Sequence, residues 1–168
     1  MKLSESEIQE RQAAAQQRAK KIDELRLSVL KGHLLMEEAL DGFIQAAVCH
    51  PEQINHVNMN FHTKAHLAIA LGCERDKDEM WSVVWAINQL RNKIAHKLDS
   101  DEIDAKVKFL RSTYVAALEP VPAEHAKTQA EKDMIDSACA VCVGFLGQLT
   151  SEAKTRRMLI DENWEGPG

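Results

Sequence analysis

The sequence predicts an all-α fold: an antiparallel helical bundle of four to five main helices, with a long N-terminal helix and a long C-terminal helix. The 168 residues are 45% hydrophobic but only 5% aromatic, and they include just 7 glycines and 4 prolines. Many of them are of the kinds that lose little conformational freedom in a helix, such as Ala, Leu, Glu, Lys and Gln. No stretch alternates apolar and polar residues with the β-branched and aromatic enrichment of a strand. Short connections between helices favour antiparallel neighbours.

An apolar stripe predicts one continuous helix over residues 22–47. Its members recur every three or four residues, at Ile22, Leu25, Val29, Gly32, Met36, Leu40, Phe43 and Ala47. Gly32 lies on the stripe, which indicates the close approach of another helix. Residues 1–21 favour a helix but carry few large apolar side chains, so we expect a helical N-terminal extension that leaves the core or packs on a second subunit. Pro51 ends the long helix because proline cannot continue its hydrogen bonding.

Four further helices complete the expected order. After a polar loop, a short helix covers about residues 60–71 and ends at Gly72. Helices follow from 76–78 to about 97 and from 100 to about 117, and prolines 120 and 122 precede a last long helix over about 123–156. The inward positions expected on these three are Met80, Val84, Ile87, Leu90 and Ile94, then Ile103, Val107, Leu110, Tyr114 and Ala117, then Met134, Ala138, Val141, Phe145 and Leu149. The expected organisation is a bundle core over 22–118, a C-terminal helix over 119–160 that packs on it, and a frayed tail over 161–168.

Charge and cysteine content narrow the classes of function. The formal net charge is −5, whereas a general nucleic-acid-binding face is basic, so any contact with RNA would be confined to a local pocket. No apolar run approaches the length of a membrane span and the N-terminus lacks the apolar core of a secretory signal, so we expect a cytoplasmic protein.

Cys139 and Cys142 form a C-x-x-C pair, but no second pair completes a zinc site, and core packing is the favoured interpretation. Phosphate-binding glycine loops, nucleophile elbows and dinucleotide fingerprints are missing, which leaves metabolic enzyme classes without support.

The run from Arg91 to His96 is the segment that most suggests chemistry. It falls in the last turns of a helix otherwise patterned for burial, and Arg91 stands where the apolar stripe would continue. Asn88, Asn92 and His96 follow at intervals of four residues, so they share one face beside Arg91. A simpler interpretation is that the cations near this helix end stabilise the macrodipole, and that Arg91 pairs with a carboxylate on the next helix.

The pattern Arg91-Asn92-x-x-x-His96 resembles the signature of the HEPN family of helical-bundle domains. Three neighbouring features are similar to bacterial members of that family: His33-x-x-x-Glu37, Phe61-x-x-Lys64 and Asn88-x-x-Arg91. The resemblance covers roughly Ile22 to Tyr114 and leaves the N-terminal extension and the last helix unmatched.

Many HEPN proteins are metal-independent ribonucleases, often the toxin of toxin–antitoxin or phage-defence systems. The resemblance implies that Arg91 and His96 are catalytic, with Asn92 and Asn88 supporting them. It also implies that Glu37 orients Arg91 or His96, as an acidic residue on an early helix does in some members; the alternative is a solvated or ion-paired acid. It implies RNA as the substrate, no cofactor or metal, and an antitoxin or regulatory protein as a partner.

The chemistry of RNA cleavage suits this pair of side chains. RNA carries a 2′-hydroxyl next to its phosphodiester, and a histidine, whose pKa lies near neutral, can accept that proton without a metal. The phosphorane that forms is more negative than the substrate, and a guanidinium stabilises it with fixed donors and a permanent charge. The expected products are a cyclic phosphate and a 5′-hydroxyl.

Helix geometry adds an expectation about assembly. Five residues place Arg91 and His96 about 140° apart around an α-helix and ~7.5 Å apart along it. The two side chains therefore do not converge on one atom unless the helix bends or two copies of the motif meet across a two-fold axis. Dimeric HEPN domains are of the second kind, so we expect a homodimer with a shared cleft lined by two Arg91 and two His96 residues, which would gather local positive charge.

Two alternatives remain open at this stage. His62 and His66 lie one turn apart and could bind a metal, but Thr63 replaces the glutamate of zinc proteases and no third ligand is evident, so no metal site is expected. The chain could also be a non-catalytic helical regulator or interaction module, resembling the mannitol operon repressor or a degenerate HEPN domain, or a structural dimerisation domain. Its acidity and unmatched end helices favour this second class.

Overall fold

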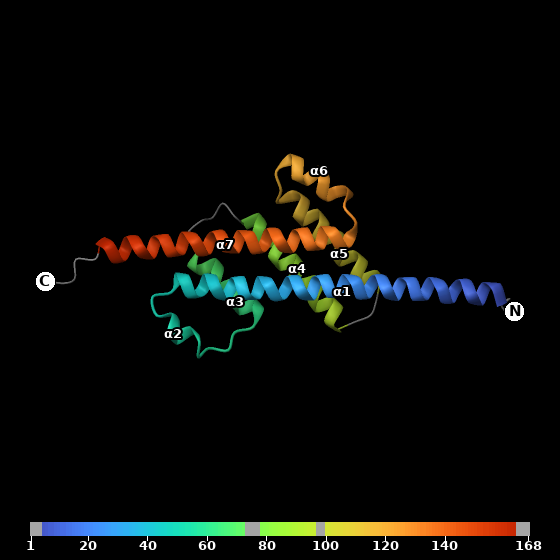
Figure 1. Ribbon diagram of the computed structural model, residues 1–168, viewed down its shortest axis with the longest axis horizontal. Coiled ribbons are helices and arrows are strands. Elements are labelled where there is room, and N and C mark those ends of the chain that lie inside the picture. Colours follow the sequence, from blue (N-terminus) through green and yellow to red (C-terminus); the bar gives the residue numbers. More distant parts are fainter. Residues whose placement is uncertain (1–4, 73–77, 97–99, 164–168) are drawn as a thin grey trace.

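The computed structural model describes residues 5–72, 78–96 and 100–163, except for the side chains of residues 78, 96, 100 and 161–163. Over this part of the chain there are seven helices and no strand, so the predicted all-α class is confirmed (Figure 1). The helices are α1 Glu5–Ala47, α2 Pro51–Ile54, α3 Phe61–Leu71, α4 Asp78–His96, α5 Ser100–Ala116, α6 Pro120–Thr128 and α7 Glu131–Asn163.

Local sequence signals explain where the N-terminal helices begin and end. Pro51 stands in the first turn of α2, where a backbone amide hydrogen is not required. This single turn of helix interrupts the loop expected between the first two helices. Asn60 caps α3, because its side chain accepts a hydrogen bond from the Thr63 amide at 2.9 Å. Gly72 follows the last residue of α3, as predicted.

The prediction of one long helix over about residues 123–156 is wrong, because the structure divides this stretch into α6 and α7. The backbone of Gln129 is extended, with ψ of 145°, although no glycine or proline marks the break. Arg111 of α5 supplies the reason: its guanidinium donates to the carbonyl oxygens of Ala126 at 2.6 Å and Gln129 at 2.9 Å. These bonds satisfy helix-end acceptors that would otherwise need a continuing helix. Helix α7 also runs on to Asn163, into the segment expected to fray, and residues 164–168 lie outside the described part.

Helices α1 and α7 lie side by side and run in the same direction (Figure 1). Three contacts fix their register: Lys21 with Glu131, Gly32 with Cys139, and Val48 with Arg157. The paired residue numbers differ by 110, 107 and 109 (131 minus 21, 139 minus 32, 157 minus 48). A residue of α1 is therefore level with the residue of α7 about 109 positions later. This pair departs from the antiparallel expectation because several intervening helices, and not a short loop, connect its members.

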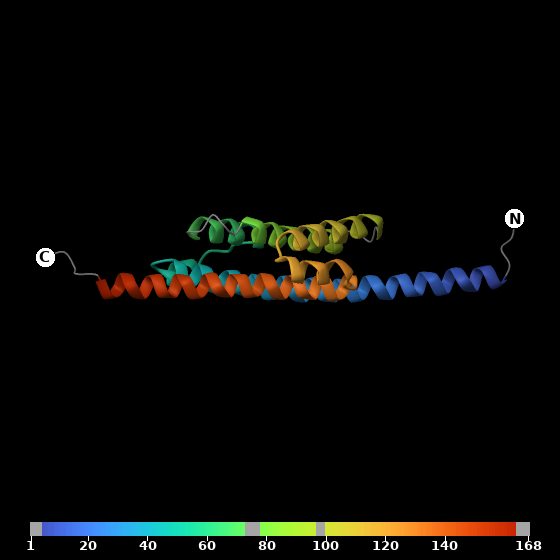
Figure 2. The same cartoon turned by 90° about the horizontal axis from the view of Figure 1, so that it is seen from above.

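The bundle has two layers (Figure 2). Helices α1 and α7 form one layer, and α4 and α5 lie on one side of it. Helices α4 and α5 form an antiparallel hairpin, held by an ion pair between Lys93 and Glu102 and a hydrogen bond from Lys106 to Gln89. Residues 5–21 of α1 are exposed, and most of this segment extends past the other helices. Near its end, Arg18 pairs with Asp101 of α5 and Lys21 with Glu131 of α7.

The core lies between these layers and is built largely from the predicted stripes. Buried members include Leu25, Val29, Met36, Leu40, Ile87, Leu90, Ile103, Leu110, Met134 and Phe145. Val141 was expected to face inward, and this is wrong: it is exposed, while its neighbour Cys142 is fully buried. The buried face of α7 steps from Ala138 to Cys142 and then to Phe145, so a thiol acting as a small apolar group takes the inward position.

Among the described helices, α7 alone has the length and apolar content of a membrane span, over Glu131–Ile160. No segment of this kind was predicted from the sequence. The mean hydropathy of the most apolar window of α7 is 1.3, and 44% of that window is buried inside the fold. Part of its apolar surface therefore serves the core of the bundle.

Candidate functional site

A pocket of about 400 Å³ between α1, α3 and α4 brings most of the predicted site residues together. Four of them line it: Glu37 from α1, and Asn88, Arg91 and Asn92 from α4. The remaining one, His96, is the last residue of α4, and its side chain lies outside the described residues. The pocket also includes His33 of α1 and three residues at the start of α3, Asn60, Phe61 and His62.

Arg91 supplies the positive charge of this pocket, and it has no carboxylate partner within the described part of the chain. Its Nη1 donates to the side-chain oxygen of Asn92 at 3.2 Å. Its Nε is buried and has no hydrogen-bond partner among the described residues. The ion pair with the next helix is made instead by Lys93, which contacts Glu102 of α5. Arg91 therefore keeps donors available for an anion, and a buried donor without a partner is costly unless a ligand satisfies it.

His33 is a second functional group of the pocket, and it is 6% exposed. Its Nε2 lies 3.1 Å from the side-chain oxygen of Asn88, which can only accept, so Nε2 carries the hydrogen and Nδ1 carries the lone pair of the neutral ring. Burial lowers the pKa of His33, and the nearby Arg91 charge adds to this, although the hydrogen bond to Asn88 opposes it. His33 is therefore a neutral imidazole at pH 7.

Glu37 is held by an ion pair with Lys64, and within the described residues no bond joins it to Arg91. The side chain of His96, which Glu37 was alternatively expected to orient, lies outside the described residues. Lys64 of α3 donates to the carboxylate of Glu37 at 3.0 Å and to that of Asp41 at 2.8 Å. Burial alone would lower the pKa of Lys64, but the two carboxylates raise it above its ordinary value. The ion-paired alternative for Glu37 is thus the one observed. The contact joins α1 to α3 and leaves the positive charge of Arg91 uncancelled.

The two histidines once considered as metal ligands form an aromatic edge beside the pocket. The rings of His62 and His66 are 4.4 Å apart, and they lie 5.2 and 4.9 Å from the ring of Trp85 on α4. Within the described residues, no group of three or more histidine, cysteine or acidic side chains is placed to hold a metal ion. The spacing of the two histidines is visible in the sequence, but their packing against Trp85 is not.

The arrangement combines a guanidinium with free donors, a neutral imidazole and two side-chain amides around one opening. Such a set can hold a singly or doubly charged oxyanion such as a phosphate. The bond between His33 and Asn88 was not anticipated, because it depends on how α1 packs against α4. The spacing of His33 and Glu37, one turn apart on α1, was the available signal.

Comparison with known proteins leaves this pocket to be interpreted from its own chemistry. No family model, no curated protein and no solved structure matches the chain.

Proposed function

We propose that the protein is a metal-independent endoribonuclease of the HEPN type, acting in the cytoplasm as a toxin or phage-defence component. The observation that carries the proposal is the state of Arg91, which lines a polar pocket with a buried, unpartnered Nε. An RNA phosphodiester would satisfy that donor and neutralise the charge. The resemblance of Arg91-Asn92-x-x-x-His96 to the HEPN signature is the basis for proposing this reaction.

In the proposed reaction, which takes place in a cleft shared by two copies of the chain, Arg91 binds the scissile phosphate and His96 accepts the proton of the adjacent 2′-hydroxyl. The 2′-oxygen then attacks phosphorus, and the bond from phosphorus to the 5′-oxygen breaks. The leaving 5′-oxygen takes up a proton from water, which gives a 2′,3′-cyclic phosphate and a 5′-hydroxyl, and His96 returns its proton to the solvent. The guanidinium stabilises the extra negative charge of the phosphorane. Asn88 and Asn92 support the pair, and Asn92 does so by accepting a hydrogen bond from Arg91.

The acidic chain would hold RNA through this local site and not across a broad face. Lys64 and Lys93 are each engaged with carboxylates, so Arg91 is the pocket's own source of attraction for phosphate. A homodimer and an antitoxin or regulatory protein are the partners that we propose. An antitoxin would restrain the enzyme by covering the opening of the pocket.

The test is cleavage of total RNA by the purified full-length chain in excess chelator. We expect cleavage that Arg91→Ala and His96→Ala each reduce by at least about 100-fold, the usual cost of removing a charge-stabilising or proton-transferring group. Arg91→Lys keeps the charge but loses the forked donors, so its loss should be smaller. The control variants Arg11→Ala and His125→Ala change exposed residues on α1 and α6 and should cleave normally.

Two results would contradict the proposal. One is intact RNA with folded wild-type protein. The other is cleavage that the Arg91 variant retains at the wild-type level, which would indicate a contaminating nuclease. Mass spectrometry of the products provides an independent check, because a 3′-phosphate that never passes through the cyclic form is inconsistent with 2′-hydroxyl attack.

A non-catalytic regulator or protein-interaction module is the second candidate, and one observation favours it. Two polar residues of the pocket, Glu37 and Asn88, are already engaged by Lys64 and His33, as expected for a rigid recognition surface. Harmless overexpression of the wild type, together with no RNA cleavage, would support this candidate over the ribonuclease.

A further inference from the structure

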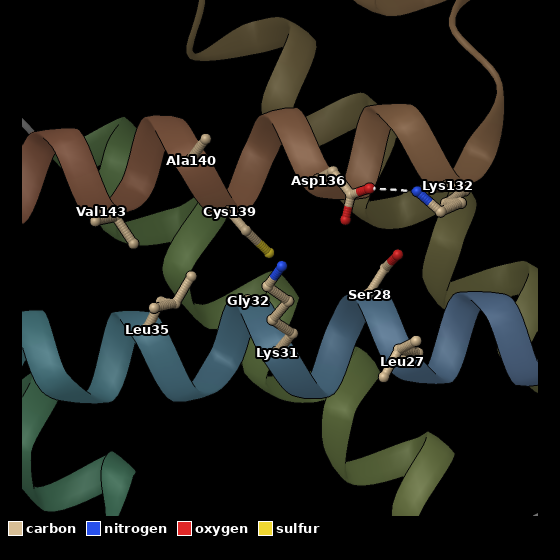
Figure 3. Close-up of a pocket in the computed structure, with 10 residues that line it drawn as sticks. All are labelled: Leu27, Ser28, Lys31, Gly32, Leu35, Lys132, Asp136, Cys139, Ala140 and Val143. Atoms are coloured by element: carbon tan, nitrogen blue, oxygen red, sulfur yellow. Dashed lines mark hydrogen bonds and ion pairs between the residues drawn. The ribbon is translucent and has the colours of Figure 1, made fainter.

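The outer face of the α1–α7 layer, which is turned away from α4 and α5, carries an apolar groove between the two helices (Figure 3). Its volume is about 480 Å³, and residues of both helices line it. Leu35 of α1 and Val143 of α7 stand on opposite sides of the groove, and Leu35 is 44% exposed. Because α4 and α5 lie behind this layer (Figure 2), the groove opens away from the core.

Small residues form the outer side of α7 beside this groove. Exposed small residues recur every three or four positions and so lie in one stripe, at Ala140, Gly144, Gly147 and Ser151. A Cβ atom added at Gly144 or Gly147 would meet nothing within 4 Å, so no contact inside the described chain requires either glycine, in contrast to Gly32. Helices with small residues at their contact can approach each other to about 8 Å. The outer side of α7 is therefore shaped for close contact with another helix.

Four exposed charged residues lie on the same face. Lys31 and Glu38 of α1 come four residues before and three residues after Leu35, so the three share one stripe. Asp133 and Lys154 of α7 lie in line with the small residues, beyond the two ends of their stripe. None of the four forms an ion pair within the described residues. Each helix therefore offers one positive and one negative group on its outer side.

We infer that a second copy of the chain packs its outer face against this one. The two-fold axis lies between the two layers and perpendicular to the helices, so that α1 lies antiparallel on α1 of the other copy and α7 on α7. A two-fold contact requires that the surface be complementary to itself. The charged residues meet this requirement.

The charged residues define the position of the axis. If Lys31 pairs with Glu38 of the other copy, the axis is level with position 34.5 of α1, the midpoint of 31 and 38. If Asp133 pairs with Lys154 of the other copy, the axis is level with position 143.5 of α7, the midpoint of 133 and 154. These two positions differ by 109, which is the register of α1 and α7 within one chain. A single axis therefore satisfies both kinds of ion pair.

The same axis brings the apolar and small residues together. Leu35 and Val143 lie within one residue of it, so they meet their own copies and fill the two facing grooves. Ala140 comes level with Gly147 of the other copy, because the midpoint of 140 and 147 is also 143.5. The four helices then form a bundle with an apolar centre and ion pairs on either side of it.

The extent of the outer face agrees with this axis. Helices α1 and α7 lie side by side from position 22 of α1, which is level with the start of α7 at Glu131 (131 minus 109), to the end of α1 at Ala47. The midpoint of 22 and 47 is again 34.5. This stretch is about 38 Å long and roughly two helix diameters, or 20 Å, wide. Its area of about 750 Å² is close to what one partner contributes to a standard protein interface, about 800 Å².

This inference does not depend on the proposed ribonuclease activity. The pocket of Arg91 lies between α1, α3 and α4, whereas the outer face is formed by α1 and α7. Contact through the outer face therefore leaves the Arg91 cleft free, and a chain that uses both faces forms a tetramer. The tests measure association and not RNA cleavage, so failure of this inference and failure of the proposed activity are distinguishable.

The first experiment is analytical ultracentrifugation of the full chain over a range of concentrations. Gly144→Glu adds a long charged side chain within one residue of the axis, so we expect it to halve the mass of the wild-type assembly. Its helical circular dichroism signal should be unchanged, because an added Cβ meets nothing within 4 Å in its own chain. Ala105→Glu makes a similar change at an exposed position of α5 and should leave the mass unchanged. A monomeric wild type, or an assembly that Gly144→Glu leaves intact, would overturn the inference.

The second experiment exchanges charges between copies. Lys31→Glu or Glu38→Lys places like charges together at two symmetric contacts, and we expect either variant alone to associate at least about 10-fold more weakly. Lys108→Glu, the same charge change at an exposed position of α5, is the control. An equimolar mixture of the first two variants should regain wild-type association, because every substituted side chain then faces an opposite charge. A mixture that associates as weakly as its components contradicts the antiparallel arrangement.

The third experiment locates the axis by disulfide formation in a background with Cys49→Ser and Cys73→Ser. Gly144→Cys should give a covalent dimer on oxidation, since the two copies of this position lie next to each other across the axis. Met158→Cys is the control: the side chain is 64% exposed, but the axis places it beyond the start of α7 in the other copy. Equal cross-linking of the two variants would show that the axis is not where the charged residues put it.

Discussion

Replacing Gly32 by alanine tests the closest approach in the fold. A Cβ atom at this position would lie 2.2 Å from the Sγ and 2.7 Å from the Cβ of Cys139. Ordinary contacts between such atoms are about 3.5–4.0 Å, so α1 and α7 would have to separate by roughly 1 Å. Rotation of the thiol can relieve the contact with sulfur but not the contact with its Cβ, which moves only with the backbone of α7.

The magnitude follows from two opposing effects. Overpacking of a close-packed core costs about 1–3 kcal/mol, while replacing a helical glycine by alanine returns about 0.5–1 kcal/mol. We expect Gly32→Ala to lower the free energy of unfolding by about 1–2 kcal/mol, which for a chain of this size is a fall in Tm of about 3–6 °C.

Urea unfolding followed by circular dichroism at 222 nm, at one fixed protein concentration, measures this change. Gly42→Ala is the matched control on the same helix, because an added Cβ there meets nothing within 4 Å; it should gain about 0.5–1 kcal/mol. Cys139→Gly removes both opposing atoms, so the pair should show a favourable coupling energy in a double-mutant cycle. If Gly32→Ala stabilises the protein as much as Gly42→Ala, the close approach of α1 and α7 is not as described.

Three further predictions concern other parts of the bundle. Arg111→Met should destabilise the protein by about 1–3 kcal/mol, because the carbonyl oxygens at the end of α6 lose a charged donor, and hydrogen exchange should rise around the junction of α6 and α7. The pKa of His33 is lower in the folded protein than its ordinary value of 6.5. As the pH falls below 6.5, His33 is therefore protonated in the unfolded chain before it is protonated in the fold. The free energy of unfolding should then decrease towards acid pH by up to about 1.4 kcal/mol per pH unit. Urea midpoints at pH 7.5 and 5 should reveal this decrease, and His33→Gln should remove that part of it. Burial raises the pKa of Cys139 to about 12 and that of Cys142 further, so iodoacetamide at pH 8 should modify the exposed Cys49 first and reach the two buried thiols only on unfolding, as peptide mapping will show.

The helices were predictable wherever a periodic stripe coincides with a local boundary signal. Residues 22–47 carry such a stripe, and Asn60 and Gly72 mark the ends of α3. Gly32 was recognised as a close approach because it interrupts an apolar face with the smallest residue. The break between α6 and α7 was not predictable, because a side chain from α5 imposes it and no local residue signals it. The parallel course of α1 and α7 is likewise set by packing between segments far apart in the sequence.

The site was predictable in composition and only partly in its contacts. Four of the expected residues line one pocket because they come from adjacent turns of α4 and from α1, which packs against it. Glu37 was placed correctly in that pocket, but its partner is Lys64 and not Arg91. The link between His33 and Asn88 spans 55 positions, and no sequence pattern indicates a hydrogen bond over that separation.

The parallel course of α1 and α7 constrains the order in which the chain folds. The hairpin of α4 and α5 has contacts between near neighbours in sequence and can form early, since closing a short loop costs little entropy. The face of α1 that meets α7 has its partners about 109 positions later. During synthesis at about 5–20 residues per second, α1 leaves the ribosome several seconds before those partners exist. Until α7 arrives, the side of α1 around Gly32 is open to solvent, and this interval is when the nascent chain is most exposed to aggregation and to capture by chaperones.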